Sequence, residues 1–307
     1  MQLFLQRWAM ISVDVNQNLP LHLAAANGYE VVVRQFLKKD INVSGFFGRT
    51  PLWNVAYRGH VMVVQLLLEI HGIDINASDN LSGIPIMMSL CNNHPEVTRL
   101  LIDKGADIDT SSRFGYAPLH AAARNGNKEM SKKLLDKGCD GFAMSHDGQT
   151  PFLLAVLSDN IELVDMLYEQ GFDGSKIPDR RGYTCIHAAA ELGNLEIMQK
   201  LRALGAEPLA HTVSGFNEAY YVACQGQVET INCIVDWMPE LKINFEDSEK
   251  VSETALCGAA SHGYFAVVQT LIESGVDVEK QSNYAGMSPL TYAAASRLPT
   301  TVRNVSM

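Results

Sequence analysis

The amino-acid sequence predicts an all-α fold in which one short helical unit is repeated and stacked many times. A phrase close to Pro-Leu-His-x-Ala-Ala restarts every 31 to 37 residues, most clearly at Pro20, Pro118 and Cys185. Glycines recur in register with this phrase. A fixed period of this length indicates repeated supersecondary units, each of which buries its apolar face only against its neighbours.

The first helix of each unit is expected to begin at the phrase itself. Proline suits the first helical turn, where its missing amide hydrogen costs nothing, and the small residues that follow let neighbouring helices approach closely. A glycine eight residues after the proline, such as Gly126, ends the helix in a tight turn. Weaker copies of the phrase begin at Pro51, Pro85, Pro151, Glu218, Ala255 and Pro289.

The second helix follows that turn. Its apolar residues recur at helical spacing, as in Val97, Leu100 and Leu101, so this face is expected to belong to the core. Gly105 lies just past the helix, at the expected place for a left-handed cap. The chain then turns outward into a loop that carries another glycine, such as Gly115, three residues before the next phrase.

This unit resembles the ankyrin repeat closely, and the resemblance covers nearly the whole chain. It implies a solenoid of stacked helix-turn-helix units with short projecting β-hairpin loops. We expect residues 1–17 to form a partial repeat with only its second helix, and 18–284 to form eight repeats in one solenoid. Residues 285–297 would supply the first helix of a ninth repeat, and 298–307 a disordered tail.

Several units depart from the pattern. Trp53 and Tyr220 replace the histidine, and the third unit is one residue short before Pro85. The seventh unit is the longest, because it carries Trp237-Met238-Pro239 and the acidic run Glu246-Asp247-Ser248-Glu249. We interpret this insertion as a tolerated surface loop. The last predicted helix would leave an apolar face uncovered, so either a partner covers it or the chain is a piece of a longer array.

Composition bounds the function. The net charge is −10 and the pI is near 5.3, which argues against broad nonspecific binding to nucleic acid or to an anionic membrane. The six cysteines are far apart without a C-x-x-C pair, which favours free thiols in a reducing compartment. No apolar run approaches 18 residues, so we expect no membrane span and an intracellular protein, cytoplasmic or nuclear.

The sequence contains none of the common catalytic or phosphate-binding motifs, and we expect no enzyme activity, no cofactor and no metal. His22, His120 and His187 recur, but they share one slot of the repeat, where the resemblance implies hydrogen bonding within the scaffold. His60, His146 and His262 lie near turns or loop tips and are mutually remote in sequence, so we do not expect them to form a metal site.

The resemblance also implies where a partner binds, namely across the loop tips and the inner helices. Five slots matter in each unit: five, four and two residues before the proline slot, and six and seven after it. The candidate contacts in these slots are Phe46, Phe47, Arg49, Tyr57, Arg58, Arg113, Phe114, Tyr116, Arg124, Asn125, Arg180, Arg181, Tyr183 and Phe216. These slots hold six of the twelve arginines but only three acids, so an acidic, partly apolar peptide or protein surface is the favoured ligand.

Alternatives remain open at this point. The arginines and aromatic residues could be ordinary solvated positions, or could contact phosphates and bases of a nucleic acid. The favoured function is a noncatalytic interaction scaffold or adaptor. A second hypothesis is a transcriptional co-regulator that acts through a DNA-binding partner, and a third is the recruiting arm of a larger multidomain enzyme or regulator. Neither the partner's identity nor the oligomeric state follows from the sequence.

Overall fold

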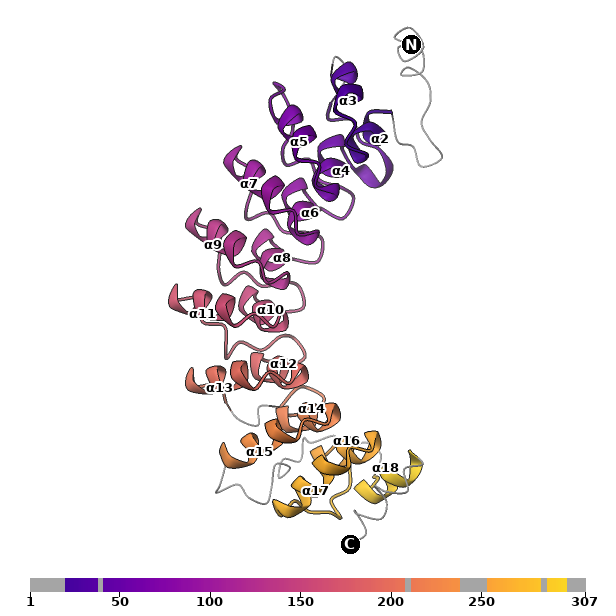
Figure 1. The fold of residues 1–307 in the computed structure, drawn as a ribbon, viewed down its shortest axis with the longest axis vertical. Coiled ribbons are helices and arrows are strands. Elements are labelled where there is room, and N and C mark those ends of the chain that lie inside the picture. Colours follow the sequence, from indigo (N-terminus) through magenta and orange to yellow (C-terminus); the bar gives the residue numbers. More distant parts are fainter. Residues whose placement is uncertain (1–19, 38–40, 208–210, 238–252, 283–285, 297–307) are drawn as a thin grey trace. The chain divides into compact units, whose positions relative to one another are not determined.

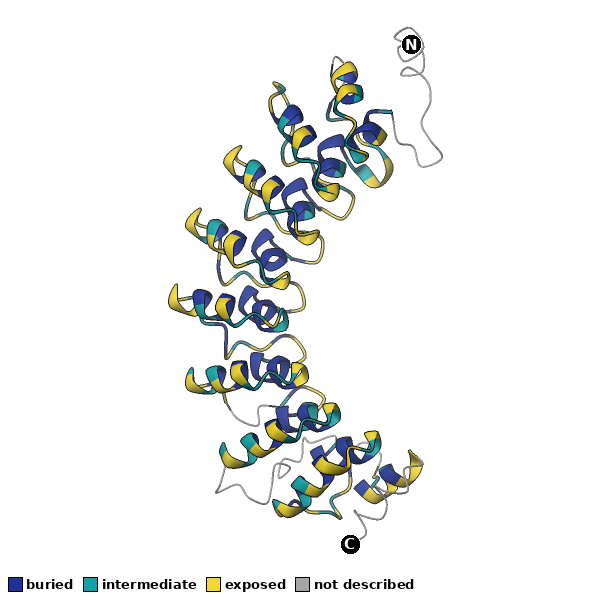
Figure 2. Cartoon of the chain, viewed as in Figure 1, coloured by how far each residue is buried: buried dark blue, intermediate teal, exposed yellow. Residues whose placement is uncertain are grey.

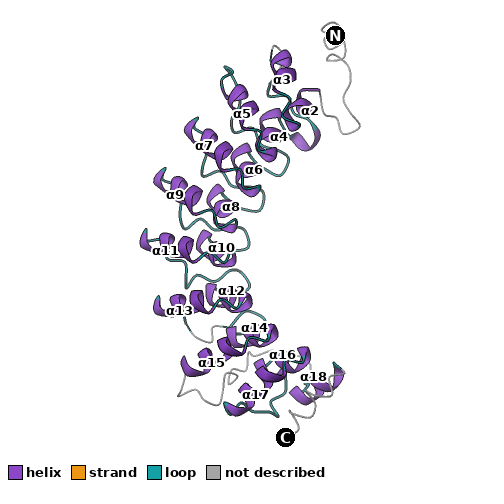
Figure 3. Ribbon diagram, viewed as in Figure 1, coloured by secondary structure: helices purple, strands orange, loops and turns teal. Residues whose placement is uncertain are grey.

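The computed structural model of the 307-residue chain describes residues 20–37, 41–207, 211–237, 253–282 and 286–296. All regular structure in these ranges is helical (Figure 3). The chain divides into two compact units, Met1–His146 and Asp147–Met307. Each of these units contains several of the helical repeats, and from here on a single helix pair with its loop is called a repeat.

The first unit stacks helices in consecutive antiparallel pairs. The first helix of each pair contacts the first helix of the next pair, and the second helices do likewise (Figure 1). The elements are α2 (Pro20–Ala26), α3 (Glu30–Phe36), the 3-10 turn η1 (Phe46–Gly48), α4 (Pro51–Arg58), α5 (Val61–Leu68), α6 (Pro85–Cys91), α7 (Pro95–Asp103), α8 (Pro118–Arg124) and α9 (Lys128–Asp136).

The second unit stacks its first helices in the same order. Its elements are α10 (Pro151–Leu157), α11 (Ile161–Glu169), α12 (Cys185–Leu192), α13 (Leu195–Ala203), α14 (Glu218–Gln225), α15 (Val228–Trp237), α16 (Ala255–His262), α17 (Phe265–Glu273) and α18 (Pro289–Ala295). The helix α18 falls within the predicted range 285–297. The expected partial repeat at 1–17, the tail at 298–307 and most of the insertion in the seventh repeat, including Glu246-Asp247-Ser248-Glu249, lie outside the described residues.

Local sequence sets the helix ends. The residue before the proline slot often caps the first helix; the hydroxyl of Thr50, for example, accepts a hydrogen bond from the amide of Trp53 at 3.2 Å. At the turn eight residues after the proline slot, Asn93 and Asp159 stand where other repeats have glycine and adopt left-handed φ values of 54° and 58°. After glycine, asparagine and aspartate tolerate this conformation best, which explains how the two repeats that contain Asn93 and Asp159 keep the turn.

The core follows the predicted faces. Most first helices, such as α8 and α10, are buried almost all round, and small side chains such as Ala122 and Ala123 leave no exposed surface (Figure 2). The clearest exception is α18, which buries only Pro289 and Ala293. Second helices bury one side and expose the other (Figure 2). Leu101, predicted as core from its spacing, is completely buried.

The recurring histidine slot is used for hydrogen bonding within the scaffold, as predicted. The Nε2 atom of His22 lies 3.0 Å from the carbonyl oxygens of both Val43 and Arg49, and Nδ1 of His187 accepts from the amide of Thr184 at 3.0 Å. Where Trp53 or Tyr220 replaces the histidine, its side chain still makes a hydrogen bond to the next repeat. Trp53 Nε1 donates to the Gly83 carbonyl at 3.1 Å, for example.

The projecting loops are tight turns, and no described loop contains a β-strand, whereas the resemblance implied short β-hairpins. In the loop before α8, the amide of Ser112 donates to the Tyr116 carbonyl at 2.9 Å and that of Gly115 donates to Ser112 at 2.8 Å. The main chain joins only the Ser112–Tyr116 pair across this turn, so the pairing is not extended into a ladder of strand pairs. In the third repeat, Ser82 takes the place of the glycine in this turn and adopts a left-handed φ of 61°.

Consecutive loop tips are joined through main-chain atoms. In the first unit the carbonyl oxygens of Phe47, Leu81 and Phe114 each accept a hydrogen bond from an amide of the next tip at 2.9 Å. In the second unit the carbonyls of Asp147 and Arg181 accept in the same way, at 2.8 and 2.7 Å. These bonds hold the tip side chains in a regular row.

Candidate functional site

An exposed apolar row runs along the loop tips of the first unit. We call Phe47, Leu81 and Phe114 the tip row; their exposed fractions are 52%, 47% and 57%. Phe47 also has a left-handed φ of 58°, a conformation that is costly for an aromatic residue. Phe46 lies beside it, with the two ring centroids 3.8 Å apart. Three apolar side chains in register are therefore presented to solvent by a rigid backbone.

A stack of rings and guanidinium groups leads from this row onto the first helix α4. The Arg49 guanidinium carbon lies 5.4 Å from the Phe47 ring centroid and 4.2 Å from that of Trp53. Tyr57 stacks on Trp53 with centroids 5.3 Å apart and nearly parallel planes, and Arg58 lies 5.6 Å from the Tyr57 ring. We call these five residues the arginine–aromatic ladder.

The other predicted contacts of the first unit differ in exposure. Arg113, Arg124 and Asn125 are exposed, whereas Tyr116 is half-buried and packs edge-on against His120 with centroids 5.5 Å apart. The side chain of Asn125 donates to the Leu90 carbonyl of the preceding pair at 2.5 Å, so it also has a scaffold role. Four arginines of this unit make no ion pair within the described residues: Arg49, Arg58, Arg113 and Arg124.

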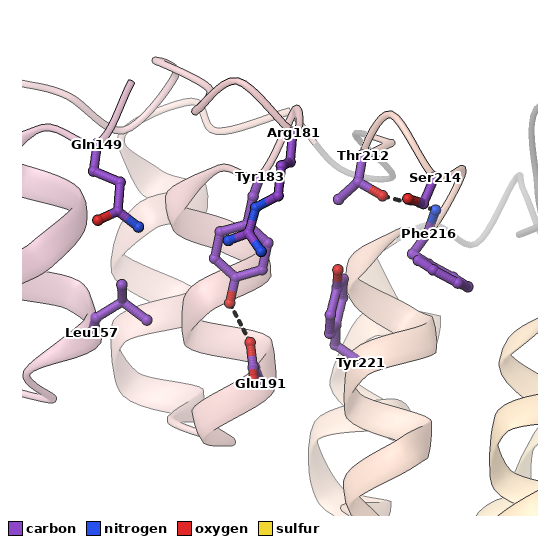
Figure 4. A pocket seen from close by; sticks show the side chains of 9 residues that line it. All are labelled: Gln149, Leu157, Arg181, Tyr183, Glu191, Thr212, Ser214, Phe216 and Tyr221. Atoms are coloured by element: carbon purple, nitrogen blue, oxygen red, sulfur yellow. Dashed lines mark hydrogen bonds between the residues drawn. The ribbon is translucent and has the colours of Figure 1, made fainter. Parts of the chain in front are cut away.

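In the second unit the candidate residues surround a pocket of about 360 Å³ (Figure 4). The structure brings Arg181, Tyr183 and Phe216 together there, while Arg180 is exposed and lies outside the lining. The lining is completed by Gln149, Leu157, Glu191, Thr212, Ser214 and Tyr221. All lining residues except Thr212 and Tyr221 occupy the five predicted slots.

Tyr183 forms the centre of one pocket wall and is only 7% exposed, which is more buried than expected for a groove residue. Its hydroxyl donates to a carboxylate oxygen of Glu191, and its ring meets that of Tyr221 edge-on with centroids 5.7 Å apart (Figure 4). Burial, together with the hydrogen bond to Glu191, raises the pKa of Tyr183 above its ordinary value. The tyrosine is therefore a neutral hydrogen-bond donor at physiological pH.

The Arg181 side chain has a counter-ion. The buried Asp179 carboxylate lies 3.4 Å from its guanidinium group, and the same aspartate accepts hydrogen bonds from the amides of Arg181 and Tyr183 at 2.8 and 2.9 Å. The arginine side chain itself is 76% exposed. The loop turn thus fixes an aspartate beside the arginine.

Sequence reasoning missed some members of these surfaces. Leu81 occupies the same slot as Phe47 and Phe114, so the slot rule could have found it. Tyr221 is half-buried and lies on α14 one residue past the histidine slot, and no signal in the phrase singles it out. Thr212 is a loop-turn residue whose hydroxyl accepts from the Phe216 amide at 3.1 Å, which recurring polar residues at this turn position could have indicated.

The described residues contain no group of three His, Cys, Asp or Glu side chains placed to hold a metal ion. His60, one of the histidines considered above, has its Nε2 3.0 Å from the Ala26 carbonyl of the preceding pair. All six cysteines are free, with Cys139, Cys185 and Cys257 buried. None of the described helices is long and apolar enough to cross a bilayer.

Comparison with known proteins gives matches along most of the chain. The family model for ankyrin repeats in three copies matches residues 2–79, 80–144 and 119–212, and the model for ankyrin repeats in many copies matches 256–297. Synphilin-1 from Mus musculus is 26% identical over 151 residues, which cover 37% of this chain and 16% of that protein. The probable E3 ubiquitin-protein ligase XBOS33 from Oryza sativa subsp. japonica is 41% identical over 68 residues, 22% of this chain and 13% of that protein.

Alpha-latroinsectotoxin-Lt1a from Latrodectus tredecimguttatus is 30% identical over 135 residues, which cover 40% of this chain and 9% of the toxin. The chain therefore spans less than a fifth of the length of each of these three relatives. The likeness to them concerns the repeats.

Proposed function

Because this chain belongs to the ankyrin repeat family, whose repeats are protein-interaction modules, we propose that it is a noncatalytic scaffold that binds an acidic, partly apolar segment of a partner protein. The observation that carries the proposal is the surface made by the tip row and the arginine–aromatic ladder of the first unit. The candidate contacts there are Phe46, Phe47, Arg49, Tyr57, Arg58, Arg113, Phe114, Tyr116, Arg124 and Asn125.

Charge supports an acidic ligand at this surface. Arg58, Arg113 and Arg124 are exposed and form no ion pair in the part of the chain that the structure describes. Guanidinium groups pair bidentately with carboxylates, so an acidic segment would give these arginines the counter-ions they lack. Because the whole chain has a negative net charge, this local surplus of arginine would attract acidic ligands to this surface and not to the protein in general.

Apolar surface supports specificity for a protein rather than for a polyanion. Aromatic residues and arginine dominate binding energy at protein interfaces, because aromatic rings bury large areas with few rotatable bonds and the planar guanidinium group both pairs with carboxylates and stacks on rings. Arg49 is held between the Phe47 and Trp53 rings, so much of the ordering is already present before a partner binds. Phosphate contacts alone would not use the exposed Leu81.

The proposal includes no reaction catalysed by this chain. The absence of a reaction from the proposal is supported by the recurring histidines. These residues are the best suited to acid–base chemistry, but they make hydrogen bonds that hold the repeats together. A second candidate role, the recruiting arm of a longer protein, is favoured by the repeats shared with a relative called a probable E3 ubiquitin-protein ligase. The six free thiols fit an intracellular location.

A random peptide display library, selected on the full chain, tests the proposal. We expect the enriched peptides to combine aspartate or glutamate with aliphatic or aromatic residues. The enriched peptide, labelled with fluorescein, should lose at least tenfold in affinity when Phe47, Arg113 and Phe114 are replaced by alanine together, because two hot-spot aromatics and one charge pair are removed, at about 1 kcal/mol or more each.

The matched control replaces Val31, Arg34 and Met62 with alanine, which also removes two exposed apolar side chains and one arginine. This control should bind the peptide as the wild type does. Enrichment of basic peptides, or equal binding by the Phe47, Arg113 and Phe114 variant, would refute the proposed site.

A further inference from the structure

We propose that the pocket of the second unit binds a basic side chain, lysine or arginine, of a partner protein, between the carboxylate of Glu191 and the rings of Tyr183, Tyr221 and Phe216. This ligand chemistry is opposite to the one proposed for the first unit. The inference shares the premise that the chain binds proteins, but none of its residues belongs to the tip row or the arginine–aromatic ladder.

The two charged residues that line the pocket differ in how far their charges are already balanced. Arg181 has the buried carboxylate of Asp179 as its counter-ion, at 3.4 Å. Glu191 makes no ion pair with any described residue, and the one hydrogen bond that its side chain makes with them is accepted by Oε2 from the Tyr183 hydroxyl. The unbalanced charge of the pocket is therefore negative.

The Tyr183 hydroxyl also orients the Glu191 carboxylate. The Oε2 atom accepts the hydrogen bond of the Tyr183 hydroxyl (Figure 4). The Oε1 atom accepts none from a described residue, so it would be available to a ligand. Charge-assisted hydrogen bonds to a carboxylate are among the stronger polar contacts in proteins. The same negative field raises the pKa of Tyr221, after the larger effect of its burial.

The remaining walls suit a long basic side chain. Tyr183, Tyr221 and Phe216 line one space, with the Phe216 and Tyr221 centroids 6.3 Å apart at a steep angle. Aromatic faces attract cations, and the apolar Leu157 offers a surface for an alkyl stem. A pocket of about 360 Å³ lies at the small end of the range for ligand sites and suits a single side chain.

Arg181 is the feature that opposes this assignment, because its guanidinium carbon lies 5.8 Å from the Tyr183 ring. Its side chain is 76% exposed, however, and is tied to Asp179 at the loop, whereas Glu191 lies on the helix α12. A cation at Glu191 would therefore meet a carboxylate without a counter-ion among the described residues, whereas the charge of Arg181 is already balanced by Asp179.

The test uses the full chain labelled with 3-fluorotyrosine and followed by fluorine NMR, with Tyr183→Phe and Tyr221→Phe to assign the two resonances. The probes are the N-acetyl N-methylamides of lysine, norleucine and glutamate, titrated at constant ionic strength. We expect the lysine probe alone to shift the Tyr183 and Tyr221 resonances saturably. Glu191→Gln, which keeps a hydrogen-bond acceptor for Tyr183, should weaken this binding about tenfold.

Glu196→Gln is the matched control, because it removes the same charge from an exposed residue of α13 that does not line the pocket. It should leave the binding of the lysine probe unchanged, and the melting temperature of both variants verifies folding. Equal weakening by Glu196→Gln would reduce the effect to general surface charge and overturn the proposal.

Three other outcomes would also overturn it. The glutamate probe could shift the two resonances and lose this effect in Arg181→Gln, which would make the pocket an anion site. The norleucine probe could bind as well as lysine, or none of the probes could bind. Each outcome is independent of acidic-peptide binding by the first unit, so the failure of one proposal is distinguishable from the failure of the other.

Discussion

Replacing Gly115 with alanine should destabilise the first unit far more than the same change at Gly105. Both glycines have left-handed φ values, 79° and 83°. A Cβ added at Gly105 meets nothing within 4 Å, whereas one at Gly115 lies 2.7 Å from the backbone nitrogen of His146. The pair therefore separates conformational strain from the close packing of one loop tip on the next.

The magnitudes follow from these geometries. A left-handed non-glycine residue costs about 1 to 2 kcal/mol, and the lost flexibility of the unfolded chain returns about 0.4 to 1, so Gly105→Ala should cost about 1 kcal/mol. At Gly115 the next tip must also move, which adds overpacking of about 1 to 3 kcal/mol and weakens the bond between the His146 amide and the Phe114 carbonyl. We expect a total of about 3 kcal/mol.

Urea unfolding followed by circular dichroism measures both variants, and hydrogen exchange of the His146 amide reports the tip directly. Exchange at this amide should accelerate in Gly115→Ala and stay unchanged in Gly105→Ala. Equal destabilisation of the two variants, or unaltered protection of His146, would refute the role assigned to main-chain packing between tips.

Three further outcomes are expected. Ser82→Gly should stabilise the first unit by about 1 kcal/mol in urea unfolding, because it relieves the left-handed strain at a site where most repeats have glycine; no gain would mean that the serine is unstrained. Leu101→Ala should cost about 2 to 5 kcal/mol by opening a cavity, and an unchanged melting temperature would contradict its complete burial. Because its pKa is raised, Tyr183 keeps its proton above about pH 10 in the folded state, whereas the unfolded chain releases it there. Its contribution to the free energy of unfolding is therefore fully present below that pH and decreases above it. Tyr183→Phe should make this alkaline decline shallower, and an identical pH profile of unfolding would exclude Tyr183 as its source.

Much of the scaffold could be predicted from sequence because the residues that define it act locally. Proline starts a helix and alanine permits close packing wherever they occur, so the phrase predicts the pairs without knowledge of distant contacts. The charge state of the pocket could not be predicted in this way. It depends on which arginine meets which carboxylate, and Asp179 was not among the five slots that the resemblance singled out. Glu191 was counted there as one of three acids against six arginines, although the structure gives Arg181 a counter-ion in Asp179 and gives Glu191 none among the described residues.

The main-chain bonds between neighbouring tips have a consequence for how such a protein can change. The carbonyls of Phe47, Leu81 and Phe114 hold the row together, and their side chains do not take part in those bonds. Recognition can therefore be rewritten at these three positions while the architecture is inherited intact. A library randomised at positions 47, 81 and 114 would vary what is recognised on a frame that stays the same.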